Sequence, residues 1–166
     1  NKSGCCAIVT SVQFKTSDYL AMLQELAPEL ANCAPGELTA AKLPALKTVI
    51  RMGNDSTPGM LNFSAVCELG DSVPAETLAA VAAKLQPDDP INIQFTSGTT
   101  GNPKGATLSH YNILNNADIT ALRMKLTAND KLCIPVPLYH CFGMVLGTLV
   151  CITQGAAAVF PAESFD

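Results

Sequence analysis

The residues with the clearest chemical potential form one short segment, 96–105, which reads Thr-Ser-Gly-Thr-Thr-Gly-Asn-Pro-Lys-Gly. Four hydroxyl side chains, three glycines and one lysine occupy these ten positions. Backbone N–H groups, side-chain O–H groups and a cation can therefore all face one polyanion. The glycines let the backbone approach the oxygen atoms of the anion, and Lys104 supplies a positive charge. This mixture predicts a phosphate-binding loop.

Other interpretations of the same segment are weaker. A flexible Gly- and Ser/Thr-rich turn with a solvated lysine is the structural alternative. A Walker-type nucleotide triphosphatase or kinase needs the pattern G-x-x-x-x-G-K-[ST]. Here Pro103 stands where the second glycine is required, and Gly105 stands where the hydroxyl is required. No G-x-G-x-x-G opens a helix in this sequence either, so a dinucleotide oxidoreductase has no support.

An α/β arrangement is expected to position this loop. Residues 91–95 alternate apolar and polar side chains and predict a strand that ends where the loop begins. Behind the loop, Ser109 is the expected N-cap of a helix. The apolar side chains expected on one face of that helix are Ile113, Leu114, Ala117, Ala121 and Met124. Further strands at 131–136 and 156–160, with a helix at 143–153 between them, favour a largely parallel sheet with helices on both faces.

The first part of the chain predicts a second unit of the same kind. A strand at 6–10, a capped helix at 19–26 and a strand at 46–52 suggest a parallel strand-helix-strand unit. The pattern is weak from 54 to 74, and a helix is expected at 74–85. We therefore expect three segments: the strand-helix-strand unit at 1–53, an irregular connection with a helix at 54–90, and the phosphate-loop unit at 91–166.

Two motifs carry a resemblance to a known family. The run from Phe95 to Lys104 resembles the signature of the adenylate-forming (AMP-binding) superfamily, which includes acyl-CoA synthetases, luciferases and the adenylation domains of peptide synthetases. The run from Pro137 to Gly143, Pro-Leu-Tyr-His-Cys-Phe-Gly, looks like the second motif of these enzymes. Shorter matches at 13–16, 28–29 and 43–44 resemble the medium-chain fatty acyl-CoA ligases. The chain thus resembles part of the large N-terminal domain of an acyl-CoA synthetase.

The resemblance implies a role for particular residues. The residues that it places on the β- and γ-phosphates of ATP are Thr96, Ser97, Gly98, Thr99, Thr100, Gly101 and Lys104. It places Tyr139 and His140 beside the acyl pocket, whereas a lone histidine in an apolar run is otherwise most often a hydrogen-bonded core residue. It implies no catalytic nucleophile or base and no metal ligand in this chain.

The resemblance also implies a reaction. A carboxylic acid, with a medium-chain fatty acid expected, is activated by ATP and Mg²⁺ as acyl-adenylate and transferred to coenzyme A. The magnesium, ribose and catalytic-lysine motifs of the family are absent from these 166 residues. We therefore expect the chain by itself to be inactive. The alternatives are an adenylation domain that loads a carrier protein and a non-catalytic nucleotide-binding module.

Composition excludes several other classes of protein. The formal net charge is −4, and ten lysines and arginines are scattered singly, which argues against nucleic acid as a partner. The longest apolar stretch, 141–152, is too short to predict a transmembrane segment. Uncovered sheet edges would favour a homo-oligomer.

The cysteines indicate the compartment. Seven cysteines, mostly in apolar surroundings, predict reduced, buried thiols in an intracellular protein, cytoplasmic if bacterial and of unknown organelle if eukaryotic. Their spacing, with only two histidines in the chain, does not match a metal site.

Overall fold

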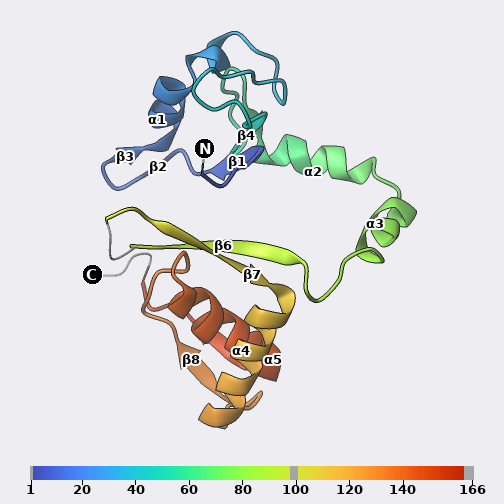
Figure 1. The fold of residues 1–166 in the computed structure, drawn as a ribbon, viewed down its shortest axis with the longest axis vertical. Helices are drawn as coiled ribbons and strands as arrows, with labels where there is room; N and C mark the ends of the chain where they lie inside the picture. Colours follow the sequence, from blue (N-terminus) through green and yellow to red (C-terminus); the bar gives the residue numbers. More distant parts are fainter. Residues whose placement is uncertain (1, 98–100, 163–166) are drawn as a thin grey trace. The chain divides into compact units, whose positions relative to one another are not determined.

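The computed structural model describes residues 2–97 and 101–162 of the chain. These residues form two units, Asn1–Ala83 and Lys84–Asp166, each with its own hydrophobic core (Figure 1). The boundary falls inside the stretch 54–90 that the sequence analysis assigns to a connection. The predicted α/β class, with a parallel sheet and helices, is confirmed. The finer division into three segments stays a prediction.

A three-stranded parallel sheet organises the first unit. Its strand order is β1 (Ala7–Thr10), β4 (Thr48–Arg51), β5 (Leu61–Asn62), and both neighbouring pairs are parallel. Between β1 and β4 the chain forms the short hairpin of β2 (Gln13–Phe14) and β3 (Ser17–Asp18). The helix α1 (Tyr19–Leu26) follows, so a helix lies between the parallel strands β1 and β4 along the chain.

Capping and burial explain why this unit folds. The Asp18 carboxylate accepts the Ala21 N–H at 2.9 Å and so caps α1, where the sequence predicted a cap. The chain then enters the short 3-10 helix η1 (Pro28–Ala31). The buried apolar side chains of the core are Leu23, Ala27, Leu30, Leu38, Ala40, Leu46, Val49 and Met60.

Two helices end the first unit. The predicted helix at 74–85 is present as α3 (Ala75–Ala82). A second helix, α2 (Phe63–Asp71), was not predicted, because turn residues on either side of it leave only a short apolar run; none of its side chains is fully buried. The cap was visible in the sequence: the Asn62 side-chain oxygen accepts the Ala65 N–H at 2.7 Å.

The second unit begins with an antiparallel hairpin of β6 (Pro90–Thr96) and β7 (Lys104–Ser109) (Figure 1). The sequence predicted the first strand but led directly from the loop into a helix, so β7 corrects that order. Because residues 104–109 contain Gly105 and Ala106, they show no strand-like alternation of large apolar side chains. Gly105 lies opposite Phe95, and a Cβ there would come within 2.9 Å of the Ile93 side chain. The pairing therefore depends on a residue without a side chain.

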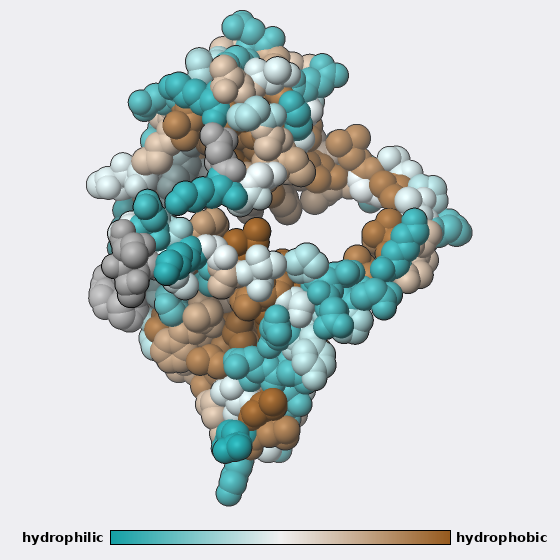
Figure 2. Space-filling model, viewed as in Figure 1, coloured by the Kyte–Doolittle hydropathy of each residue, from teal (hydrophilic) through white to brown (hydrophobic). Residues whose placement is uncertain are grey.

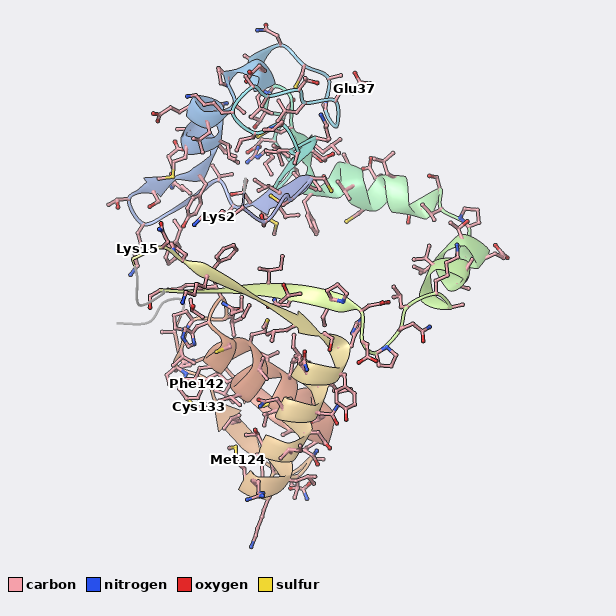
Figure 3. All side chains as sticks on the ribbon, in the orientation of Figure 1. Lys2, Lys15, Glu37, Met124, Cys133 and Phe142 are labelled. Atoms are coloured by element: carbon pink, nitrogen blue, oxygen red, sulfur yellow. The ribbon has the colours of Figure 1, made fainter. Side chains whose placement is uncertain are left out.

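The helix after the hairpin begins where it was expected. In α4 (His110–Met124), Ser109 caps the first turn and forms a reciprocal capping box with Asn112. Of the five apolar residues predicted on one face, the buried ones are Ile113, Ala117 and Ala121. Leu114 and Met124 are instead about half exposed, Met124 at the end of the helix (Figure 3).

The rest of the second unit packs against α4. The strands β8 (Lys131–Cys133) and β9 (Ala157–Val159) are parallel, as predicted. The helix expected between them consists of the π-helix η2 (Phe142–Leu149) followed by α5 (Val150–Gln154). The two glycines of η2 permit close packing: a Cβ at Gly143 would lie 2.4 Å from the Pro137 carbonyl oxygen, and one at Gly147 would lie 2.9 Å from Ile134.

Most of the cysteines are exposed, whereas the sequence predicted that they are buried. All seven are free, but Cys151 alone is buried, Cys33 is half-buried and the other five are exposed. The prediction of mostly buried thiols is therefore wrong. The exposed cysteines lie before β1, on α2, on β8 and in the turn before η2. Their neighbours in the sequence are apolar, but the cysteine side chains themselves are not buried.

Apolar surface is also extensive elsewhere (Figure 2). Ile91, Ile93 and Phe95, which share one face of β6, are each about 45% exposed. Throughout the described part of the chain, every helix is too short or too polar to cross a lipid bilayer. Homo-oligomer formation stays a prediction.

Because Gly59 lies in close contact with η1, we expect the stability of the chain to be sensitive to substitution at this position. Gly59 has φ +70°, and a Cβ there would lie 2.2 Å from the Leu30 carbonyl oxygen. We expect Gly59→Ala to lower the free energy of unfolding by about 2–4 kcal/mol, through left-handed backbone strain and overlap with η1. Denaturant unfolding followed by circular dichroism measures this. Gly70→Ala on α2, where a Cβ meets no atom within 4 Å, is the matched control and should not destabilise the chain. Equal stability of the two variants would contradict the packing described here.

Candidate functional site

The phosphate-loop residues lie at one end of the β6–β7 hairpin. Thr96 ends β6, Lys104 begins β7, and the two are direct cross-strand partners. Opposite residues of an antiparallel pair point to the same face of the sheet, with Cβ atoms about 5 Å apart. The hairpin therefore presents a hydroxyl and a cation side by side. Gly98, Thr99 and Thr100, also predicted in this site, lie outside the described residues.

Lys104 lies on a strand and not on the loop where the sequence predicted it. The sequence placed Lys104 on a loop, whereas its backbone is the first residue of a paired strand. The side chain is exposed, and no ion pair of Lys104 is found among the described residues. A strand-held lysine loses less backbone freedom on binding an anion than one in an unpaired loop.

The remaining described loop positions are open to solvent. Ser97 and Gly101 are both exposed. Gly101 has φ +81°, a backbone conformation that favours glycine, and a Cβ there would meet nothing within 4 Å. Backbone conformation, and not crowding, therefore accounts for glycine at this position.

Tyr139 and His140 occupy an exposed turn before η2. Tyr139 is 82% exposed and His140 is also exposed, so the alternative of a core histidine is wrong. The His140 N–H donates to the Pro137 carbonyl at 3.2 Å, and the His140 carbonyl accepts the Met144 N–H at 3.0 Å. The neighbouring Phe142 is labelled in Figure 3 and is also exposed. The turn thus has an ordered backbone and solvent-facing side chains.

The turn also orients the imidazole ring. The Phe142 N–H donates to His140 Nδ1 at 3.1 Å, and the Cys141 thiol lies 3.8 Å from the same nitrogen. Because Nδ1 accepts a hydrogen bond, we assign the proton of the neutral ring to Nε2. The outer nitrogen of His140 is then a hydrogen-bond donor.

One side chain connects this turn to the phosphate-loop hairpin. Gln94 of β6 donates from Nε2 to the carbonyl oxygen of Tyr139 at 2.8 Å, across 45 residues of sequence. The structure therefore brings both predicted motifs onto one unit. The sequence analysis did not single out Gln94, because a polar residue in an alternating strand gives no indication of its partner.

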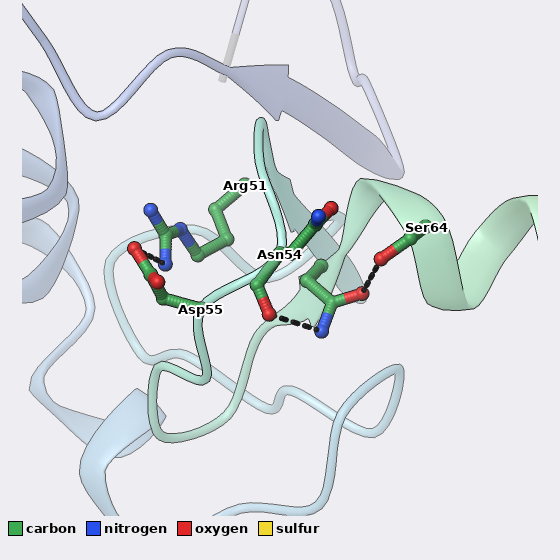
Figure 4. Close-up of polar contacts among 5 residues, drawn as sticks. Arg51, Asn54, Asp55 and Ser64 are labelled. Carbon is green, nitrogen blue, oxygen red and sulfur yellow. Dashed lines mark hydrogen bonds and ion pairs between the residues drawn. The ribbon is translucent and has the colours of Figure 1, made fainter.

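A second polar cluster lies in the first unit, at the carboxyl ends of β4 and β5 (Figure 4). Buried Arg51 pairs with exposed Asp55 at 3.1 Å. Asn62 donates to the Asn54 carbonyl at 3.2 Å and accepts the Ser64 hydroxyl at 3.0 Å. Asn62 also caps the first turn of α2, and the buried Arg51 Nε has no hydrogen-bond partner among the described residues. We interpret the cluster as structural.

The resolved pKa shifts also have structural causes. The Thr127 hydroxyl and N–H lower the pKa of the Asp130 carboxyl, and the Ala41 N–H lowers the pKa of Glu29. Burial raises the pKa of the Cys151 thiol. None of these groups belongs to the hairpin end or to the turn at 137–142.

Similarity to known proteins is consistent along the whole chain. The chain is 44% identical over 167 residues to the mitochondrial medium-chain acyl-CoA ligase ACSF2 of Danio rerio, a match that covers 99% of this chain and 27% of that protein. The human protein of the same name is 44% identical over 170 residues, which cover 99% of this chain and 28% of that protein. The chain therefore spans little more than a quarter of the length of these curated relatives.

Solved structures agree on the fold. The anthranilate CoA ligase AuaEII, solved in complex with anthranoyl-AMP, aligns over 96% of this chain and 27% of its own with a TM-score of 0.70 at 18% identity. A red-emitting luciferase from Phrixothrix hirtus aligns over 99% of this chain and 28% of its own with a TM-score of 0.63 at 21% identity. The family described as AMP-binding enzyme matches residues 1–166. The chain belongs to this AMP-binding enzyme family.

Proposed function

We propose that the chain is part of an ATP-dependent acyl-CoA ligase, with a medium-chain fatty acid as its substrate. The observation that supports this most directly is the end of the β6–β7 hairpin, where Thr96 and Lys104 are cross-strand partners. The names of two relatives that are 44% identical to the chain over the aligned 167 and 170 residues support coenzyme A as the acceptor and a medium-chain acid.

The proposed role of the hairpin end is electrostatic. A carboxylate oxygen of the acid attacks the α-phosphorus of ATP, the bond to the bridging oxygen breaks, and pyrophosphate leaves with the charge. Hydroxyls, backbone N–H groups and the Lys104 ammonium are donors fixed in advance, and such donors stabilise charge as it develops. The proposed ligands of the β- and γ-phosphates are Thr96, Ser97, Gly98, Thr99, Thr100, Gly101 and Lys104. Coenzyme A then displaces AMP through attack of its thiol on the acyl carbon.

In the proposal, magnesium enters the site together with the nucleotide. No group of three His, Cys, Asp or Glu side chains that could hold a metal ion exists within residues 2–97 and 101–162. We propose that Mg²⁺ arrives bound to the phosphates of ATP. No step of the proposal requires a metal ligand from the residues described here.

The proposed role of the turn is to orient the acid. His140 offers a donor at Nε2, which suits a carboxylate oxygen, and the exposed ring of Tyr139 offers an apolar wall for the acyl chain. The Gln94 bond supports a shared site, since it joins this turn to the strand that ends at Thr96.

Loss of the lysine charge should affect the use of ATP. In the full-length ligase, we expect Lys104→Ala to lower acyl-adenylate formation by about one to two decades, because one charge-assisted contact to phosphate is removed. ATP–pyrophosphate exchange with octanoate measures it. Lys131→Ala is the matched control, because Lys131 is also exposed and also begins a strand. An unchanged exchange rate in Lys104→Ala would remove the hairpin end from the proposal.

The ring of His140 gives a prediction for the chain itself. In its neutral form we expect the proton on Nε2, because Nδ1 accepts the Phe142 N–H. Long-range ¹H–¹⁵N correlation spectra of the 166-residue chain distinguish the two tautomers, with His110 as the internal reference. A proton found on Nδ1 would refute the proposed donor toward the acid.

The 166-residue chain by itself should make no acyl-adenylate at a measurable rate. In-line reaction requires the acid and ATP to be held together, and such positioning contributes about 7–11 kcal/mol to lowering a barrier. The proposal assigns only the pyrophosphate end and the acid to the described residues, and the magnesium, ribose and catalytic-lysine motifs of the family are absent from the 166 residues. Hydroxamate trapping with ATP and octanoate tests this, with the full-length ligase as the positive control. Turnover by the short chain comparable with that of the full-length ligase would show that the proposed site is complete without further residues.

A further inference from the structure

We propose that Gln94 is a positioning residue that couples the phosphate-binding hairpin to the Tyr139–His140 turn. This inference rests on the proposed function, and it assigns a role to a residue outside both motifs. Gln94 touches neither the phosphates nor the acid in the proposal. It acts through the peptide group that precedes His140.

The first step is the position of Gln94 in the hairpin. Its backbone pairs with Ala106, and it lies two residues before Thr96 on the same strand. Side chains two apart on a strand point to one face, so Gln94, Thr96 and the partner residue Lys104 share a face of the hairpin. The opposite face carries Ile91, Ile93 and Phe95. The contact with the turn is therefore on the face that holds the phosphate-binding groups.

The second step is the particular group that Gln94 holds. The peptide unit between Tyr139 and His140 is planar, so its carbonyl and its N–H move together. Gln94 donates to that carbonyl at 2.8 Å, and the N–H of the same unit donates to the Pro137 carbonyl at 3.2 Å. Both ends of one rigid plane are thereby fixed. The orientation of this plane sets the position of the His140 Cα and hence of its ring.

The third step is that no other polar contact duplicates this one. Among the described residues, no further hydrogen bond joins β6 or β7 to residues 137–142. The turn is held from the other side by the helix η2, through the close approach of Gly143 to Pro137. Packing against η2 fixes the turn within its own segment, whereas Gln94 fixes it relative to the hairpin.

The coupling predicts a selective kinetic effect in the full-length ligase. Gln94→Met keeps the length of the side chain and removes the donor. We expect the KM for octanoate in ATP–pyrophosphate exchange to rise about tenfold, while the KM for ATP stays within about twofold. Gln86→Met is the matched control, because among the described residues the side-chain amide of Gln86 donates only to the adjacent Leu85 carbonyl. It should leave both constants unchanged.

A double-mutant cycle separates positioning from general stability. If Gln94 acts through His140, Gln94→Met should have little further effect in a His140→Ala background. Additive losses, or an equal rise of the KM for ATP, would show a merely structural role and overturn the inference.

The tautomer spectrum of the 166-residue chain gives a readout that does not depend on catalysis. We expect Gln94→Met to shift the ¹⁵N resonances of His140 and Gln86→Met to leave them in place. Unshifted His140 resonances would overturn the inference while leaving the proposed function intact. Absence of exchange in the unsubstituted ligase would instead overturn the proposed function and the role of Gln94 within it.

Discussion

The antiparallel pairing of β6 with β7 is the constraint on which the candidate site depends. Two strands that share a ladder bring Thr96 and Lys104 opposite each other, although eight positions separate them in the chain. The pairing is possible because Gly105 leaves room for the Ile93 and Phe95 side chains. A lysine on a paired strand has a defined direction. Its backbone is then fixed before any anion arrives, which favours the electrostatic role proposed for its side chain.

A second constraint operates at the turn before η2. Gly143 and Gly147 let the helix lie directly against residues 134–137, where a methyl group would overlap the strand extension. Buried Val145 and Val150 anchor the same helix against α4. The rigid packing on this side leaves the exposed side chains of the turn, Tyr139 among them, to face outward. The segment 137–150 therefore combines apolar side chains that pack against α4 with side chains that face the solvent.

These two constraints suit chemistry that needs no nucleophile from the protein. In acyl-adenylate formation the acid itself attacks, and the protein contributes orientation and charge. That division agrees with the pKa shifts, since the Asp130 carboxyl, whose pKa is lowered, and the Cys151 thiol, whose pKa is raised, lie outside the hairpin and the turn. Solved structures that share this fold include a CoA ligase and a luciferase, and a fold does not by itself determine the reaction.

The local signals in the sequence were sufficient for several elements and for the family. The caps at Asp18 and Ser109 are contacts between near neighbours, which leave a readable pattern. The strands at 91–95, 131–136 and 156–160 were predicted from local runs of strand-forming side chains, although their pairing partners lie farther along the chain. The phosphate-binding roles of the loop residues stay predictions. Their residue types indicate an anion, and the comparisons support the family as a whole.

Tertiary structure alone decided the features that depend on partners distant in sequence. Strand β7 is stabilised by pairing with β6, so its own residues, with Gly105 at the tightest point, did not indicate a strand. Burial depended on what packs above a residue, which is why most of the cysteines are exposed despite apolar neighbours. The bond from Gln94 to the Tyr139 carbonyl joins residues 45 positions apart, and a backbone carbonyl is present at every position. Residue types can therefore indicate which ligand a segment binds. Which of many equivalent backbone carbonyls accepts a hydrogen bond from a given side chain is decided by the fold alone.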